Sequence, residues 1–294
     1  MTIARWATMA YFCEMDTTKV LIGDVGATSS DWALLTPAGI RYFQATGYNP
    51  VTQSREQLDM LLTEVVQVVP PGQALELRYY GAGAGSALLK EQIGDSFKRV
   101  YDMRDMEISS DLLAAARATC QDGPGVVCIL GTGSNAGIYD GVRIVEQTPT
   151  LGYPLGDEGS GTDIGKRLVK SFYYGLLPAD LHSVMMDVLP EDRYDFLKEL
   201  SKSQHPNRFL AQFTRIAGKY KSHPYVRGLL ARSFQDFITI HLGKQKKYQK
   251  INFVGSVAYY FCAELSASLA KEELTMGMVI QKPIEGLAEY HLAT

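Results

Sequence analysis

The chain has 294 residues, 46% of them apolar, which is enough for one large domain or two ordinary ones with a substantial core. Its net charge of −3 gives no electrostatic basis for binding nucleic acid or an anionic membrane. The four cysteines form no CxxC pair, which argues against a zinc or redox site and favours a reduced, cytoplasmic protein. No apolar run reaches transmembrane length, and we expect residues 1–19 to be an N-terminal extension rather than a signal peptide.

The first strong signal is a strand that ends in an acid. The apolar run Val20–Ile22 predicts a buried strand, and Asp24 follows at a position where burial would favour an apolar side chain. A carboxylate beside a turn rich in N–H and hydroxyl donors suits a metal–phosphate group, although a plain hairpin with Asp24 as a turn former has the same pattern. The residues of the predicted turn are small: Gly26, Ala27, Thr28, Ser29 and Ser30.

The first hundred residues alternate between strand and helix patterns. Asn49 precedes Pro50 just after a strand, so its amide either makes a local turn or faces a ligand. The glycines of Gly81–Gly85 form a strand–loop–helix joint of the kind that often faces ligands, although tight packing at such a joint needs glycine too. The predicted elements are strands at Val20–Asp24, Ser30–Leu35 and Arg41–Gln44, a helix at Ser54–Val69, a strand at Leu75–Tyr80, a helix at Leu88–Phe97, and a short strand with a linker in Arg99–Ile108.

A helix is predicted from Ser109 to Ala118, with Asp111 near its start. Serine or aspartate at a helix start is a normal N-cap, which stabilises by roughly 0.5–2 kcal/mol. Taken alone, this pattern favours a capping role for Asp111.

A second strand–turn–strand unit follows about a hundred residues after the first. Val126–Leu130 is an apolar strand, and the turn after it contains Gly131, Thr132, Gly133 and Ser134. The repetition indicates a weak internal duplication. Next, Asp157 and Glu158 lie between glycines at the entrance to a predicted helix over Thr162–Tyr173, which is unusual for a plain solvated turn.

The rest of the chain is predicted to be mainly helical. Residues Asp180–Lys250 have helical spacing, ending in a basic turn at Gly243–Lys250 that we interpret as a solvated helix end. The remaining predicted elements are a strand over Ile251–Ala258, a helix over Tyr259–Leu269, a strand at Val279–Ile280, and a last helix that begins near Pro283 and includes His291.

Five motifs occur in a recognisable order: D-x-G-x-T-S-S from Asp24, S-D-L-L-A-A-A-R-A from Ser110, I-L-G-T-G-S-N-A from Ile129, L-G-D-E-G-S-G from Leu155, and F-V-G-S-V-A from Phe253. Together they resemble the sugar kinase–Hsp70–actin superfamily, closest to the N-acetylglucosamine kinase branch of the BadF/BadG/BcrA/BcrD ATPase group. The resemblance implies an α/β fold with two ribonuclease-H-like lobes, the actin-like ATPase fold, and a cleft between them. The lobes would span residues 20–117 and 118–282, the second with a helical insertion, and the last helix, about 283–294, would pack back on the first.

The resemblance also implies ATP and Mg²⁺ as cofactors and a set of site residues. Asp24 matches the residue that acts on Mg²⁺, and Asp111 matches the general base that takes the proton from the sugar hydroxyl. The sugar would be held by Asn49, Thr132 and Asp157. The nucleotide would contact Gly26, Thr28 and Ser29 in the first phosphate loop, Gly131, Thr132, Gly133 and Ser134 in the second, and Gly255, Ser256 and Ala258 in the adenosine loop.

The resulting hypothesis is ATP-dependent phosphorylation of an amino sugar, with N-acetylglucosamine as the first candidate. We expect no nucleic-acid or membrane partner, and a homodimer is a further option. The alternatives are a regulatory ATPase that activates a partner protein, and a nucleotide or sugar sensor without turnover. The chain departs from related kinases at Tyr153-Pro154, near a position where they often have tryptophan, and it lacks the cysteine motifs of the repressor/sugar-kinase group and of the dehydratase activators.

Overall fold

The computed structural model describes residues 19–243 and 250–293. The predicted extension, apart from Lys19, and residues 244–249 of the predicted basic turn therefore lie outside the described residues. Contacts divide the chain into two compact units, and the boundary in the sequence lies between Ile108 and Ser109. The sequence prediction places the end of the first lobe at residue 117.

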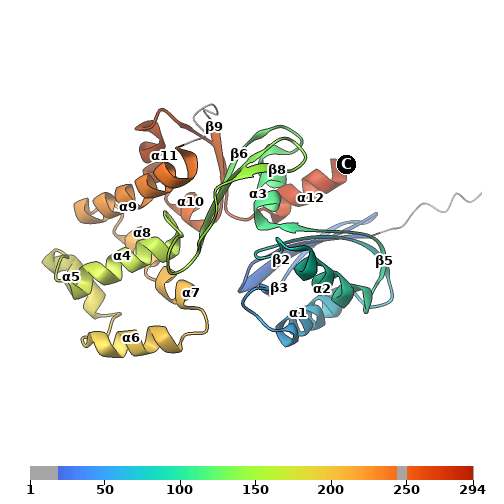
Figure 1. Cartoon of the computed structure of the whole chain (residues 1–294), viewed down its shortest axis with the longest axis horizontal. Coiled ribbons are helices and arrows are strands. Elements are labelled where there is room, and N and C mark those ends of the chain that lie inside the picture. The colour runs from blue at the N-terminus through green and yellow to red at the C-terminus, as the bar shows by residue number, and fades with distance from the viewer. Residues whose placement is uncertain (1–18, 244–249, 294) are drawn as a thin grey trace, which may run out of the picture. The chain divides into compact units, whose positions relative to one another are not determined.

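The first unit is a five-stranded mixed sheet covered on one face by two helices (Figure 1). Its strand order is β3-β2-β1-β4-β5, with β1, β2 and β3 forming an antiparallel meander and β4 running parallel to β1. The elements are β1 (Lys19–Val25), β2 (Ser29–Thr36), β3 (Gly39–Thr46), α1 (Arg55–Val68), β4 (Ala74–Gly81), α2 (Ala87–Lys98) and β5 (Asp102–Ser110).

Trp32 organises the core of the first unit. Its ring is fully buried and meets Tyr79 edge-on, with the ring centroids 6.2 Å apart. A Cβ on Gly23, the partner of Trp32 in the hairpin register, would lie 2.5 Å from the indole ring. The indole N–H donates to Ser30 Oγ at 2.7 Å, and that hydroxyl donates to the Thr46 carbonyl at 2.7 Å. The meander is therefore held rigidly up to its turn.

The second unit repeats the connectivity of the first. Its sheet has the order β10-β9-β6-β7-β8, in which β6, β7 and β8 are antiparallel neighbours and β9 runs parallel to β6. The duplication that the sequence indicated for the two hairpins thus extends to both sheets. The strands are β6 (Gly125–Leu130), β7 (Ser134–Tyr139), β8 (Ile144–Gln147), β9 (Lys250–Val254) and β10 (Thr275–Ile280).

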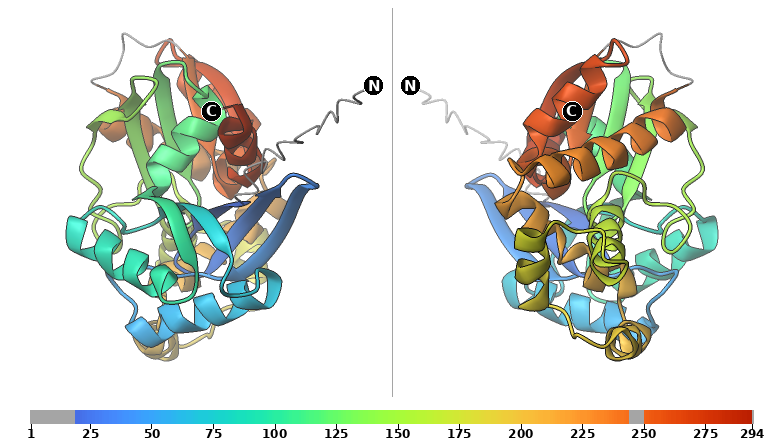
Figure 2. Two further views of the ribbon diagram at one scale, coloured as in Figure 1. Left: turned by 90° about the vertical axis from the view of Figure 1, so that its right-hand side faces the viewer. Right: turned by 90° about the vertical axis from the view of Figure 1, so that its left-hand side faces the viewer.

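Both faces of the second sheet are covered by helices (Figure 2). One face packs against α3, which also contacts α12. The other face packs against α4, α9, α10 and α11, with α5 to α8 as the helical insertion. The helices are α3 (Asp111–Cys120), α4 (Gly161–Tyr173), α5 (Ala179–Met186), α6 (Arg193–Lys202), α7 (Pro206–Ala211), α8 (Thr214–Lys219), α9 (Pro224–Phe237), the π-helix η1 (Ile238–Leu242), α10 (Ser256–Tyr260), α11 (Cys262–Ala270) and α12 (Ile284–Ala293).

One predicted strand is too long. The sequence predicts a strand from Ile251 to Ala258, but β9 ends at Val254 and helix α10 begins at Ser256. Gly255 makes the switch possible because its φ of +119° lies in a region that side chains other than glycine rarely adopt. The predicted linker near Ile108, in turn, is part of the nine-residue strand β5.

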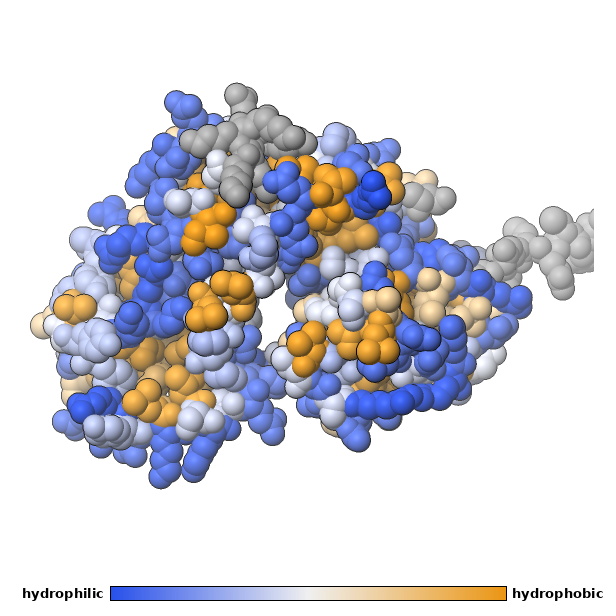
Figure 3. Space-filling view, in the orientation of Figure 1, coloured by the Kyte–Doolittle hydropathy of each residue, from blue (hydrophilic) through white to orange (hydrophobic). Residues whose placement is uncertain are grey.

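Apolar groups on the face drawn in Figure 3 occur as separate patches among polar residues. Large apolar side chains that are about half exposed in the helical insertion include Met186, Val188 and Leu197. Within the two described ranges, no helix combines the length and apolar character that a membrane span needs.

Candidate functional site

In the first unit, the turn between β1 and β2 has a fixed shape. The Gly26 N–H donates to the Ser29 carbonyl at 3.1 Å, and the Tyr48 N–H donates to the Gly26 carbonyl at 2.9 Å. The loop after β3 lies directly against the turn, because a Cβ on Gly47 would overlap the backbone of Gly26 and Thr28. Among the described residues, the backbone N–H groups of Ala27 and Thr28 have no acceptor. The turn thus keeps two donors for an anion.

Asp24 lies on β1 opposite Asp31 and is half-buried, immediately before this turn. Asn49 lies in the loop packed against the turn. Its side-chain oxygen accepts the Val51 N–H at 2.9 Å, so the local-turn interpretation holds for the oxygen. Its side-chain NH₂ has no acceptor among residues 19–243 and 250–293, and that group remains available to a ligand.

In the second unit, the equivalent turn shares its hydrogen bonds with α4. The Gly131 carbonyl accepts the Gly161 N–H at 2.8 Å, and the Thr132 carbonyl accepts the Thr162 N–H at 3.1 Å and its hydroxyl at 2.6 Å. The turn carbonyls thus satisfy donors at the start of the helix. The N–H groups of Thr132 and Gly133 have no acceptor in the described part of the chain, as in the first turn.

Asp157 contacts the far end of this turn. Its Oδ1 accepts the Ser134 N–H at 3.3 Å, and a Cβ on Gly133 would lie 2.8 Å from the same oxygen. Desolvation raises the pKa of Asp157 above its usual range; the Ser134 hydrogen bond lowers this pKa, and the charge of Glu158 adds to the rise. The Asp157 carboxyl therefore lies against the turn, and its hydrogen bond offsets only part of the cost of its desolvation. Such a carboxyl is suited to exchanging a hydrogen bond with a ligand.

Asp111 is not the N-cap that its sequence position favoured. The cap of α3 is Ser110, whose hydroxyl accepts the Leu113 N–H at 3.3 Å, and Asp111 is the first helical residue. The Asp111 carboxylate accepts the Leu112 N–H at 2.8 Å. Desolvation nevertheless raises the pKa of Asp111. A desolvated carboxylate with a raised pKa has the character of a general base.

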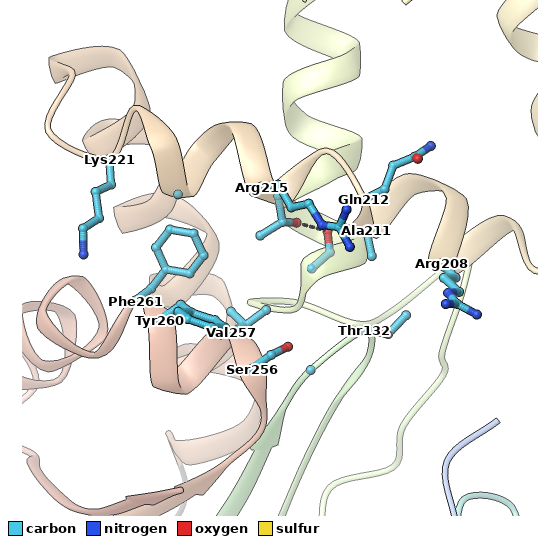
Figure 4. Close-up of a pocket in the computed structure, with 14 residues that line it drawn as sticks. Thr132, Arg208, Ala211, Gln212, Arg215, Lys221, Ser256, Val257, Tyr260 and Phe261 are labelled. Atoms are coloured by element: carbon cyan, nitrogen blue, oxygen red, sulfur yellow. Dashed lines mark hydrogen bonds between the residues drawn. The ribbon is translucent and has the colours of Figure 1, made fainter. Parts of the chain in front are cut away.

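A pocket of about 770 Å³ lies within the second unit, beside the Gly131–Ser134 turn (Figure 4). Gly131, Thr132 and Gly161 line it at the turn. One wall comes from α7, α8 and the residues after them, with three cations and a glutamine among its side chains; the opposite wall comes from α10 and the start of α11. The wall residues are Arg208, Ala211, Gln212, Thr214, Arg215, Gly218 and Lys221, facing Ser256, Val257, Tyr260 and Phe261.

The predicted site residues divide between the two units. Asp24, Gly26, Thr28, Ser29 and Asn49 surround the first turn, and all the others belong to the second unit.

Of the predicted nucleotide contacts in the second unit, Gly131, Thr132 and Ser256 line the pocket. Gly255 packs directly against the backbone at the start of the turn, since a Cβ there would overlap the Leu130 carbonyl. Ala258 is fully buried in the core and lies outside the lining of the pocket.

Sequence reasoning missed the pocket wall on α7 and α8. Arg208, Gln212 and Arg215 follow one another at spacings of four and three residues on what looks like an ordinary solvated helix face. Each side chain is exposed, so its residue type alone carries no functional signal. The helical spacing of these polar side chains, two of them cationic, is the only sequence feature that could have indicated them.

Neither unit gathers three acidic, histidine or cysteine side chains into a metal-binding cluster among its described residues. Magnesium, however, is usually held by one or two carboxylates together with phosphate oxygens and water. Asp24 beside a donor-rich turn fits that requirement.

Comparison with solved structures places the fold. A protein of Porphyromonas gingivalis, provisionally named an N-acetylglucosamine kinase, is 34% identical, with a TM-score of 0.84 over 94% of this chain and 99% of that one. A second protein with the same provisional name, from Chromobacterium violaceum, is 16% identical, with a TM-score of 0.70 over 93% and 98% of the two chains. A ROK family glucokinase from Streptomyces griseus, solved with glucose and AMPPNP, is 13% identical, with a TM-score of 0.54 over 94% and 99%.

The last two likenesses show the fold alone: the two-lobed α/β actin-like ATPase fold that the sequence predicted is confirmed. No protein-family model matches the chain, and no curated protein does. The 34% identity, which extends over nearly the whole of both chains, goes further than fold. This protein therefore belongs to the actin-like ATPase superfamily and, within it, to the family of the Porphyromonas gingivalis protein.

Proposed function

We propose that this protein transfers the γ-phosphoryl group of ATP to a hydroxyl of an amino sugar, with N-acetylglucosamine as the first candidate substrate. The observation that carries the proposal is the position of the second turn. Gly131 and Thr132 line the large pocket, while Gly133 and Ser134 contact Asp157. A nucleotide in the pocket would place its phosphates on the turn, with a sugar held by Asp157 at the turn's far end.

The pocket has the chemistry of a nucleotide site. Tyr260, which is more than half exposed, offers aromatic surface for a base, and Arg208 and Arg215 can offset phosphate charge. The third cation, Lys221, lies 3.9 Å from Glu264 in an ion pair. Arg208 follows a residue that is linked to the turn. The Thr162 hydroxyl lies within hydrogen-bond distance of both the Asn207 carbonyl and the Thr132 carbonyl. The relatives support nucleotide binding, because the Streptomyces griseus glucokinase was solved with AMPPNP.

Phosphoryl transfer depends mainly on positioning and charge neutralisation. The Thr132 and Gly133 N–H groups would bind phosphate oxygens, and Asp157 would orient the sugar. In the first unit, the Asn49 NH₂ is a further candidate donor to a ligand. Asp111 would accept the proton of the attacking hydroxyl, a role worth roughly 10²–10⁴-fold in rate. Asp24 would hold Mg²⁺. When bound, this ion would neutralise part of the charge on the phosphates.

The test is phosphate transfer from ATP to a panel of amino sugars by wild type and by Asp111→Asn. We expect Asp111→Asn to lose roughly 10²–10⁴-fold in kcat on the best sugar because it cannot accept the proton. Glu285→Gln is a matched control, since it removes an acid from the first turn of α12. It should keep full activity.

Two results would contradict the proposal. Full activity of Asp111→Asn would remove the assigned base. ADP formation that no sugar stimulates would instead favour an ATPase that acts on a partner protein.

A further inference from the structure

The loop that carries Asp157 has an unusual backbone. Asp157 has a φ of +68° and Gly159 has a φ of +74°, both in the left-handed region. For a residue with a side chain, this conformation costs of the order of 1–3 kcal/mol and persists only when the surroundings hold it. What holds this loop therefore also holds the Asp157 carboxylate on the Ser134 N–H.

Two hydrogen bonds tie the loop to the start of α4: the Gly159 N–H donates to Asp163 Oδ2 at 3.4 Å, and the Ser160 N–H donates to the Asp157 carbonyl at 3.1 Å. Further support comes from the junction of α9 and the π-helix η1. A Cβ on Gly159 would lie 2.7 Å from the Cβ of Phe237, so the last residue of α9 lies directly against the loop. The Phe237 ring stacks on His241, with the ring centroids 4.9 Å apart and the planes 28° from parallel. His241 Nε2 lies 3.4 Å from Glu158 Oε2. A π-helical turn is rare and often marks a functional position.

His241 is almost completely buried, with 3% of its side chain exposed, and its Nδ1 has no partner among the described residues. A proton on Nδ1 would leave a buried donor unsatisfied, which is costly. The tautomer that fits the site therefore carries its proton on Nε2 and donates it to Glu158. In the described residues, the only hydrogen bond or ion pair of the Glu158 side chain is the one to His241.

We propose that His241 is a positioning residue for the sugar site: by holding Glu158 through Nε2, it fixes the Gly156–Gly159 loop and with it the carboxylate of Asp157. The link to sugar binding rests on the proposed function. The link to loop order does not, and the two can be measured separately.

Hydrogen exchange measures loop order without any substrate. His241→Phe keeps the stack on Phe237 but removes the donor, and we expect the Ser134 and Gly159 amides to exchange about tenfold faster. His241→Gln keeps a donor and should restore most of the protection. His182→Phe is the matched control, because His182 stacks on Phe172 with centroids 4.8 Å apart but lies on α5, away from the loop. Unchanged exchange in His241→Phe would overturn the proposal.

Calorimetric binding then tests the sugar link. We expect His241→Phe to weaken binding of N-acetylglucosamine about tenfold and to change ATP binding less than twofold. Glu158→Ala, which removes the acceptor, should weaken sugar binding similarly, and the double variant should lose no more than either single one. Additive losses would show that the pair does not act as a unit and would overturn the proposal. Faster exchange in a protein that binds no amino sugar would instead refute the proposed function and leave the positioning role intact.

Discussion

Asp111 and Asp157 are carboxyl groups whose ionised forms are destabilised in the folded protein. Both have a pKa raised mainly by desolvation, and in each case hydrogen bonds from backbone N–H groups offset only part of this rise. Such groups destabilise the fold when they are ionised. Residues that cost stability without packing a core are characteristic of functional sites.

This leads to a prediction about pH. Because the folded-state pKa of Asp111 lies above its unfolded value, its favourable contribution is complete below the unfolded pKa and is lost as pH rises through the folded pKa. Asp111→Asn has no such dependence. We expect its Tm to exceed that of wild type by a few degrees at pH 8, and the difference to narrow steadily as the pH falls towards 3. Calorimetry across this range measures it, and a gap that does not change with pH would contradict the cause assigned to the raised pKa.

At the scale of elements, the structure depends on glycines where helices meet. Gly165 on α4 faces α7 so closely that a Cβ would overlap the Leu210 carbonyl. Gly228 on α9 has only the flexible end of Arg232 nearby, at 3.5 Å. The two positions share the same helix propensity but differ in packing, which makes them a matched pair.

We expect Gly165→Ala to lose about 1–3 kcal/mol of unfolding free energy because α7 must move away. The same change should weaken ATP binding, since α7 carries Arg208 of the pocket wall. Gly228→Ala should gain about 0.5–1 kcal/mol and leave binding unchanged. Urea unfolding and calorimetric binding measure both effects. Equal stability changes in the two variants would show that the contact between α4 and α7 is loose.

Elements were predictable where local pattern and tertiary context agree. The two hairpins, the helix at 55–68 and the acid–glycine loop before α4 could be located because spacing and small residues identify them. The end of β9 could not be, since the residues after Gly255 are small and apolar and fit either a strand or a helix. The π-helix at Ile238–Leu242 has no sequence signature, and neither does the cationic pocket wall, because both depend on packing between distant segments.

At the scale of the whole molecule, nucleotide binding should stabilise the folded chain. A ligand at a hundred times its Kd adds about 2.7 kcal/mol of stability. We therefore expect AMPPNP with Mg²⁺ to raise the Tm by several degrees, and EDTA to remove most of that shift. In Asp24→Asn the shift should be small even with Mg²⁺, because the variant lacks the carboxylate assigned to the metal. A full shift in Asp24→Asn would assign the metal to other groups.

The hydrogen bonds that tie the Gly131 and Thr132 carbonyls to the start of α4 have a thermodynamic consequence. One end of that turn lines the pocket and the other contacts Asp157, so the two ligands of the proposed reaction would share a single structural unit. We expect occupancy at one end to change affinity at the other, and linkage requires any such effect to be reciprocal. Whatever factor ATP applies to the dissociation constant of the sugar, the sugar must apply to that of ATP. Two titrations, each with the other ligand present and absent, would therefore have to return the same number.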